Sequence, residues 1–203
     1  MSKQTGLHVE LRELGALSPS GYFIGLHIRF AAPLMAFHTY PQGWRDLYTE
    51  KAYALRDPII AWGFGSTGRA RWSELGIPDP FGILEEAKQF GLVHGVAVSC
   101  GPISSRTIAG LARDDRPYTD AEMDRIEHLV VKLHDLTEPP ESLTKAQIEA
   151  LACIASGDRH AAAAAKLGIS ESALKARLTS ARQKLLARTT AEAIQRARDY
   201  RLL

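Results

Sequence analysis

The feature that most constrains this sequence is a pair of prolines, Pro139 and Pro140, inside the polar segment TEPPES at residues 137–142. A helix cannot continue through two prolines, because proline lacks the backbone N–H and fixes its own φ angle. Before this segment, strand-like and helix-like apolar patterns follow one another, whereas after it the apolar residues recur only at helical spacing. We therefore expect two domains, residues 1–136 and residues 143–203, with residues 137–142 as the linker.

Length and composition are those of an ordinary soluble protein. The chain has 203 residues, of which 45% are hydrophobic and 24% charged. No apolar run approaches the roughly 18 residues that a membrane span needs. The start, MSKQTGLHVELREL, lacks the apolar core of a signal peptide, so we expect a cytoplasmic protein. Cys100 and Cys153 have no CxxC or Cys/His cluster around them and are expected to be reduced thiols, and neither a metal nor a cofactor is predicted.

Charge is divided unevenly between the two regions. Residues 139–203 contain 11 Lys and Arg against 6 Asp and Glu, while the remainder contains 14 against 17. A basic tail on a mildly acidic body indicates that the tail is the part that meets a polyanion. Many helical domains are basic by chance, so the asymmetry alone does not decide the function.

The first region is expected to form an α+β fold. Residues 22–30 and 33–39 are predicted to be an antiparallel strand pair that turns at Ala31-Ala32, and residues 94–100 and 106–112 two further strands. Helices are expected over residues 41–52 and 80–90, and after the capping box of Thr119 and Glu122. Together these elements predict an α-β-α sandwich around an antiparallel sheet.

The second region is expected to form a small all-α domain of four helices, arranged as a helix-turn-helix. Thr144 with Gln147 starts the first helix, residues 160–167 form the second, Ser170 caps the third and residues 190–200 form the fourth. The third helix has an apolar face for the bundle, made of Leu174, Leu178, Ala181 and Leu185.

A second stripe of the third helix is small, polar and basic. It consists of Lys175, Thr179 and Arg182, with Ser172 and Ala176 beside them. Such a stripe lets a helix approach base edges while its cations meet phosphates. The alternative is a solvated basic bundle that binds nothing.

This tail resembles the DNA-binding domain of LuxR-type transcription regulators. The resemblance covers nearly the whole tail and is carried by the following residues: Leu143, Thr144, Glu149, Leu151, Gly157, Ala165, Leu167, Ile169, Ser170, Lys175, Lys184 and Leu185. The sequence departs from the family pattern at Ala146-Gln147, Ala163-Ala164, Ala173 and Leu186, which leaves the base preference open. The residues expected to contact double-stranded DNA are Thr144, Ser170, Ser172, Lys175, Ala176, Thr179 and Arg182.

The stretch YPQGWRDLYTEKAYALRDP, residues 40–58, extends the resemblance to the first region. Trp44, Tyr48, Asp57-Pro58 and Trp72 have the spacing found in the N-acyl homoserine lactone-binding domain of quorum-sensing LuxR-type regulators. The match runs from about residue 12 to residue 135. It implies a ligand-sensing and dimerisation domain, with the helix after Thr119 contributing to the dimer.

The resemblance implies a role for each polar tip of this motif. Trp44 donates to the lactone carbonyl, Asp57 accepts the ligand amide N–H, and Tyr40 donates to the acyl carbonyl. Trp72 packs beside the lactone ring and Tyr48 lies along the acyl group. Singly, each residue is equally well explained as core packing or, for Asp57, as a turn residue. Taken together, two donors, one acceptor and two further aromatics favour a ligand pocket.

The acyl tail is expected to lie along strand and helix residues. The candidates for this lining are Ile24, Leu26, Phe37 and Ile60. Many family members place a Ser or Thr on the fourth strand near the ligand carbonyl, where this chain has Ala112 or Leu111. The missing hydroxyl removes one hydrogen bond to the acyl region and indicates a different acyl substitution or another kind of ligand.

These patterns favour a dimeric, DNA-binding transcription regulator that senses an N-acyl homoserine lactone, with no membrane partner. The alternative is a solo LuxR-type regulator that responds to a different small molecule or acts without one. An enzyme is not expected, because no GxSxG, HExxH, P-loop or Cys/His metal spacing is present. Acyl length, operator sequence and the sign of regulation are not encoded in the sequence.

Overall fold

The computed structural model describes residues 3–28, 32–138, 143–200 and 202–203. The chain divides into two compact units, Met1–Thr137 and Glu138–Leu203. Four of the six residues expected to form the linker, 139–142, and Ala31 of the expected hairpin turn lie outside the described residues. No helix of the described part is long and apolar enough to cross a membrane.

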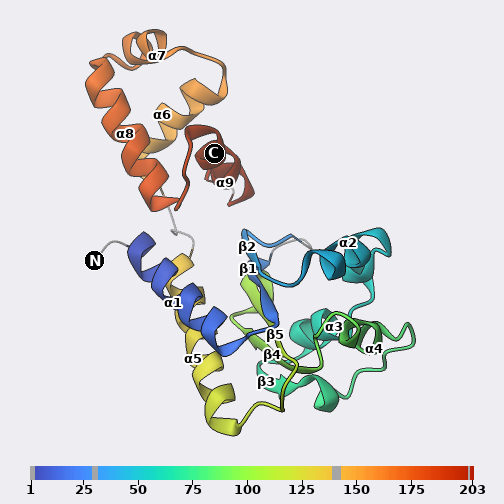
Figure 1. Cartoon of the computed structure of the whole chain (residues 1–203). Coiled ribbons are helices and arrows are strands. Elements are labelled where there is room, and N and C mark those ends of the chain that lie inside the picture. The colour runs from blue at the N-terminus through green and yellow to red at the C-terminus, as the bar shows by residue number, and fades with distance from the viewer. Residues whose placement is uncertain (1–2, 29–31, 139–142, 201) are drawn as a thin grey trace. The chain divides into compact units, whose positions relative to one another are not determined.

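A five-stranded antiparallel sheet is the centre of the first unit (Figure 1). Its strand order is β2-β1-β5-β4-β3. The strands are β1 (Gly21–Ile28), β2 (Met35–His38), β3 (Gly68–Arg71), β4 (His94–Cys100) and β5 (Arg106–Arg113). The sequence prediction is confirmed for the β1–β2 pair and for β4 and β5. Strand β3 was not predicted: its four residues, GRAR, are half-buried at the sheet edge and carry no apolar run.

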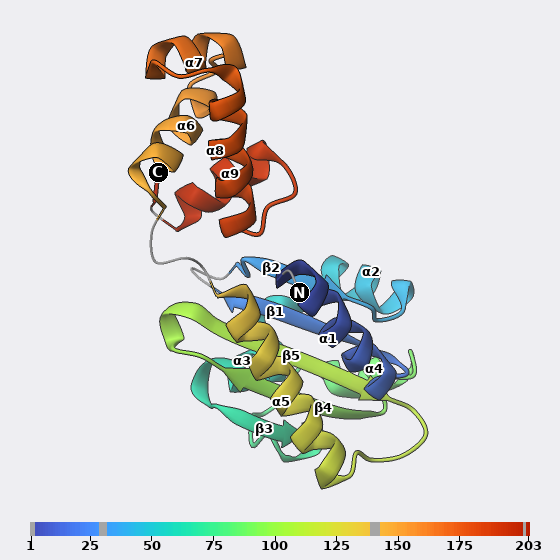
Figure 2. The same cartoon turned by 90° about the vertical axis from the view of Figure 1, so that its left-hand side faces the viewer.

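Helices cover both faces of this sheet (Figure 2). On one face lie α1 (Lys3–Leu17) and α5 (Asp120–Thr137), and on the other α2 (Gln42–Glu50), α3 (Pro58–Gly65) and α4 (Ile83–Lys88). The expected helices α2, α4 and α5 are confirmed, including the capping box in which Thr119 and Glu122 bind one another's backbone N–H groups. Helices α1 and α3 were not predicted; α3 is only eight residues long and apolar on every side, so it has no polar face to reveal its period.

The sheet separates two apolar cores. One lies between the sheet and α1 and α5, and the other between the sheet and α2, α3 and α4. Strand β1 supplies both, because successive side chains of a strand point to opposite faces. A bulge between Gly25 and Ile28, where His27 has a φ of 52°, brings Ile28 into the second core beside Phe23.

The second unit contains four helices among its described residues: α6 (Lys145–Ala155), α7 (His160–Leu167), α8 (Glu171–Lys184) and α9 (Thr190–Asp199). These helices confirm the predicted segments to within a few residues. Thr144 and Gln147 form a capping box, and the Ser170 hydroxyl accepts a hydrogen bond from the Ala173 N–H. Gly168 ends α7 with a φ of 65°, a left-handed conformation that glycine adopts without strain. The predicted apolar face of α8 is buried.

Candidate functional site

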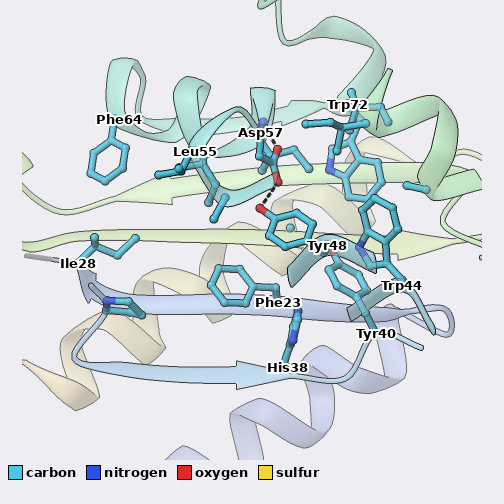
Figure 3. Close-up of a pocket in the computed structure, with 18 residues that line it drawn as sticks. Phe23, Ile28, His38, Tyr40, Trp44, Tyr48, Leu55, Asp57, Phe64 and Trp72 are labelled. Atoms are coloured by element: carbon cyan, nitrogen blue, oxygen red, sulfur yellow. Dashed lines mark hydrogen bonds between the residues drawn. The ribbon is translucent and has the colours of Figure 1, made fainter. Parts of the chain in front are cut away.

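A cavity of about 370 Å³ lies between the sheet and helices α2, α3 and α4. This volume is in the range of small-molecule sites. All six residues predicted to bind a ligand line it: Tyr40, Trp44, Tyr48, Asp57, Ile60 and Trp72. The structure thus brings together residues from three segments of the chain that are separate in sequence (Figure 3).

Asp57 is held in place by the fold. It is the N-cap of α3, with its Oδ1 accepting from the Ile59 N–H at 2.7 Å, and its Oδ2 accepts from the Tyr48 hydroxyl at 2.7 Å (Figure 3). Burial raises the pKa of Asp57, against the opposing effect of these hydrogen bonds. The pKa of the Tyr48 hydroxyl is also raised, by burial first and then by the nearby carboxylate. The cavity therefore contains a carboxylate whose solvation by water has been replaced by two donors, and a carboxylate oxygen can accept further hydrogen bonds.

The aromatic donors gather at one end of the cavity (Figure 3). Trp44 lies on α2, and its ring is 5.7 Å from the Tyr48 ring in an edge-on arrangement. Tyr40 precedes α2, and burial raises the pKa of its hydroxyl. Within the described part of the chain, no protein group accepts a hydrogen bond from the Trp44 indole N–H. These groups are donors with hydrogen-bonding capacity left over.

Trp72 lies flat against the sheet over Gly95. A Cβ atom on Gly95 would collide with the Cδ2 and Cε2 atoms of the indole, so this position requires glycine. The Trp72 Nε1 atom is enclosed and has no hydrogen-bond partner among the described residues. A buried donor without an acceptor costs about 1–3 kcal/mol, which makes Trp72 unusual for a residue that serves packing alone.

The prediction that Ile24, Leu26 and Phe37 line the tail of a ligand is wrong. Their side chains belong to the other core, with α1 and α5. Strand register explains the error: Ile24 faces Phe37, whereas Phe23 faces His38, and the second pair lies on the cavity side. The unpredicted lining residues Phe23 and Ile28 follow from this register, which the sequence pattern alone did not specify because β1 is apolar on both faces.

Other residues that line the cavity were not predicted, because nothing in their sequence pattern marks them as ligand contacts. Helix α4 contributes Ile83, Leu84 and Ala87, and α3 contributes Phe64. Helical periodicity identifies the α4 residues as an apolar face but does not tell packing from ligand contact. Of the two β5 positions expected to lack a hydroxyl, Ala112 is in the core on the cavity side, whereas Leu111 is in the core on the opposite face of the sheet. Gly110 lines the cavity and provides no hydroxyl either.

The predicted DNA-binding residues lie in the second unit. Ser172, Lys175, Ala176 and Thr179 form an exposed stripe on α8. Arg182 is half-buried: it donates to Thr179 Oγ1 at 3.1 Å and to the Arg188 carbonyl at 3.4 Å. Thr144 and Ser170 are exposed, but their hydroxyls act as helix caps.

A family model, the autoinducer binding domain, matches residues 25–136 of this chain. A curated relative is the transcriptional activator protein RaiR of Rhizobium etli, 28% identical over 173 residues, which cover 76% of this chain and 71% of RaiR.

Solved structures with the same fold include Escherichia coli SdiA, with a TM-score of 0.54 and 20% identity over 100% of this chain and 92% of that one. SdiA in complex with octanoyl-rac-glycerol has a TM-score of 0.51 and 19% identity, and the match covers 98% of this chain and 88% of that one. The N-acylhomoserine lactone-dependent LuxR-family factor CepR2 from Burkholderia cenocepacia has a TM-score of 0.51 and 18% identity. This match covers 67% of this chain and 83% of that one. At these identities the likeness is one of fold.

Proposed function

The chain belongs to the LuxR-type regulators that carry an autoinducer-binding domain, and from that premise we propose that it is a dimeric transcription regulator whose DNA binding responds to an N-acyl homoserine lactone. In this proposal residues 1–136 sense the ligand and dimerise, residues 137–142 link, and residues 143–203 form a helix-turn-helix that binds double-stranded DNA.

The observation that carries the proposal is the convergence of unlike polar groups in one aromatic cavity. A lactone ligand has two carbonyls and one amide N–H to satisfy, and each left unmet costs about 1–3 kcal/mol. Trp44 donates to the lactone carbonyl and Tyr40 to the acyl carbonyl. Asp57 accepts the amide N–H while Tyr48 orients the carboxylate at 2.7 Å. Trp72, whose indole lies over Gly95, packs beside the lactone ring.

The acyl tail extends from this polar cluster along the apolar side of the cavity, over Phe23, Ile28, Ile60 and Phe64. Each buried methylene contributes about 0.8 kcal/mol. Because the tail completes the core between the sheet and α3, ligand binding and folding of this unit are linked.

The DNA-binding part of the proposal rests on the exposed stripe of α8. Lys175 supplies a cation there, and Ser172, Ala176 and Thr179 are small enough to let the helix approach base edges. A dimer places two such helices roughly 34 Å apart, one turn of DNA, on a near-palindromic site.

The first test is a thermal-shift series with lactones of increasing acyl length. A ligand at 100 times its Kd stabilises the folded state by about 2.7 kcal/mol. We expect a length-dependent shift in the wild type and in Trp62→Phe, a control in which a buried tryptophan that does not line the cavity is altered. We expect no shift in Trp44→Phe, which lacks the indole donor. An equal shift in Trp44→Phe would remove Trp44 from the binding site.

A second candidate ligand class is favoured by the absence of a hydroxyl at Ala112, the expected β5 position that lies on the cavity side of the sheet. A monoacylglycerol, such as the octanoyl-rac-glycerol in the SdiA complex, has hydroxyls where a lactone has an amide. A solo regulator of this kind would be stabilised by acylglycerols and not by lactones in the same series.

A further inference from the structure

Arg106 begins β5 and is buried, with 8% of its surface exposed. Side chains alternate along a strand, so Arg106 shares its face of the sheet with Ile108 and Ala112, on the cavity side. Its cross-strand neighbour on β1 is Ile28, a lining residue of the cavity.

Among the residues that the structure describes, two nitrogens of the Arg106 guanidinium group have no partner. Its Nε and Nη1 atoms are enclosed and make no hydrogen bond, and no carboxylate of the described residues pairs with it. The other buried arginines differ: Arg113 pairs with Asp115 and Glu122, and Arg196 with Glu192 and the Leu185 carbonyl. A buried charge without a counter-ion opposes folding, so Arg106 does not serve stability as the other two do.

The strand pairing relates Arg106 to one particular end of the cavity. Trp44, Trp72 and Tyr40 gather at one end, and Phe64 and Ile28 lie at the other (Figure 3). Phe64 adjoins Gly63, which packs so closely on Ile108 that a Cβ atom there would meet it at 2.7 Å. Arg106 is the cross-strand neighbour of Ile28 and lies two residues before Ile108 on the same face of β5, so it adjoins the end of the cavity away from the indoles.

We propose that Arg106 binds a carboxylate at the free end of the ligand's tail. The inference rests on the proposed function and names the ligand class: an acyl chain with a polar head for the indole end and a terminal carboxylate for Arg106. A carboxylate matches the guanidinium fork with two parallel hydrogen bonds and supplies the missing counter-charge. Arg106 does not line the cavity, whereas its cross-strand neighbour Ile28 does, so only a tail long enough to pass Ile28 reaches it.

The test compares homoserine lactones in pairs of equal chain length, one ending in methyl and one in carboxylate, by calorimetric titration of the full chain. Above a threshold chain length, we expect the carboxylate-ended lactone to bind at least tenfold more tightly than the methyl-ended one. Below that length we expect it to bind more weakly, because its charge is buried without reaching Arg106. In Arg106→Met the methyl-ended ligand should bind as before and the preference should reverse. Arg106→Lys keeps the charge without the fork and should retain only part of the preference.

Two further measurements separate this role from a structural one. Arg12→Met removes an exposed arginine on α1, across the sheet from the cavity, and should leave the preference unchanged. Without ligand, Arg106→Met should melt at or above the wild-type temperature, because an unpaired buried charge has been removed. If methyl-ended lactones bind the wild type and carboxylate-ended ones never bind better, or if both Arg106 variants lose structure, the inference is overturned while the proposed function stands. If no lactone of either kind binds, the proposed function itself fails.

Discussion

At the scale of single residues, Asp57 combines a structural and a proposed binding role that differ in their dependence on charge. As the N-cap of α3 it needs only an acceptor oxygen, which asparagine also provides. As the acceptor for a ligand amide, an ionised carboxylate is stronger than a neutral amide oxygen. Asp57→Asn therefore separates the two roles better than Asp57→Ala, which removes the cap as well.

We predict that Asp57→Asn loses at least tenfold in lactone affinity but keeps its fold, with a stability difference that depends on pH. Burial raises the folded-state pKa of Asp57 above its unfolded value of 3.8, so the folded state binds the proton more tightly. The wild type then loses stability as pH rises from 3.8 through the folded pKa, and Asp57→Asn does not. In urea unfolding, the free energy of unfolding of the variant relative to that of the wild type should be higher at pH 7 than at pH 4. A difference that is the same at both pH values would contradict the raised pKa.

Gly95 is the residue on which the position of Trp72 depends. We predict that Gly95→Ala displaces the indole, destabilises the first unit by about 1–3 kcal/mol as an overpacking substitution does, and abolishes ligand binding. The wavelength of tryptophan emission and the thermal midpoint report the two effects. Gly65→Ala, at the end of α3 with nothing within 4 Å of the added methyl, is the matched control and should change neither. An unaltered emission spectrum in Gly95→Ala would mean that the indole of Trp72 is not displaced, and the prediction would be wrong.

The polar residues that line the cavity, Trp44, Tyr48, Asp57 and Trp72, were predicted through the family resemblance that their types and spacing carry. The apolar members were less predictable. Whether Ile24 or Phe23 faces the cavity depends on strand register, and β1 is buried on both faces. The isolation of Arg106 and of the Trp72 Nε1 atom depends on what surrounds them in space, which no local pattern states.

At the scale of elements, predictability followed the presence of terminal signals. Helices α5, α6 and α8 have Thr119, Thr144 and Ser170 as caps, and each begins where its cap predicts. Helix α3 also has a cap, Asp57, followed by proline, but its apolar sequence hid the period. The bulge before Ile28 requires His27 at a φ of 52°, which is rare for a residue other than glycine and has no sequence signature.

Helix α8 gives a prediction about DNA binding in which two predicted cations behave differently. Lys175 is exposed, so Lys175→Ala should reduce by about one the slope of log affinity against log salt concentration, with little effect on stability. Arg182 also holds the Arg188 carbonyl and Thr179, so Arg182→Ala should additionally lower the melting temperature. Lys88→Ala, an exposed lysine of the first unit, is the charge-matched control. A slope in Lys175→Ala equal to that of the control would place the DNA on another face.

At the scale of the whole molecule, the two units differ in what stabilises them. The first contains a cavity between its sheet and α2, α3 and α4. In the described part of this unit, the Trp72 N–H and two guanidinium nitrogens of Arg106 have no hydrogen-bond partner. The second is a bundle whose apolar residues fill its own interior. A ligand that binds the first unit adds stability there by mass action. Any effect on DNA binding must therefore pass through dimerisation or through coupling between the units, and the size of that coupling is a measurable free energy.

Differential scanning calorimetry of the full chain measures this coupling. We predict two unfolding transitions, because each compact unit has its own core. A lactone at 100 times its Kd should add about 2.7 kcal/mol to the transition of the first unit alone. An operator duplex should stabilise the second unit. If the ligand promotes DNA binding, the stabilisation by lactone and operator together should exceed the sum of their separate stabilisations. If the ligand releases the DNA, the combined stabilisation should fall below that sum. Asp57→Asn is the control, since it should keep the operator effect and lose the lactone effect. A single transition that moves as a whole with lactone alone would show that the units already unfold together, and the two-unit account of regulation would then be wrong.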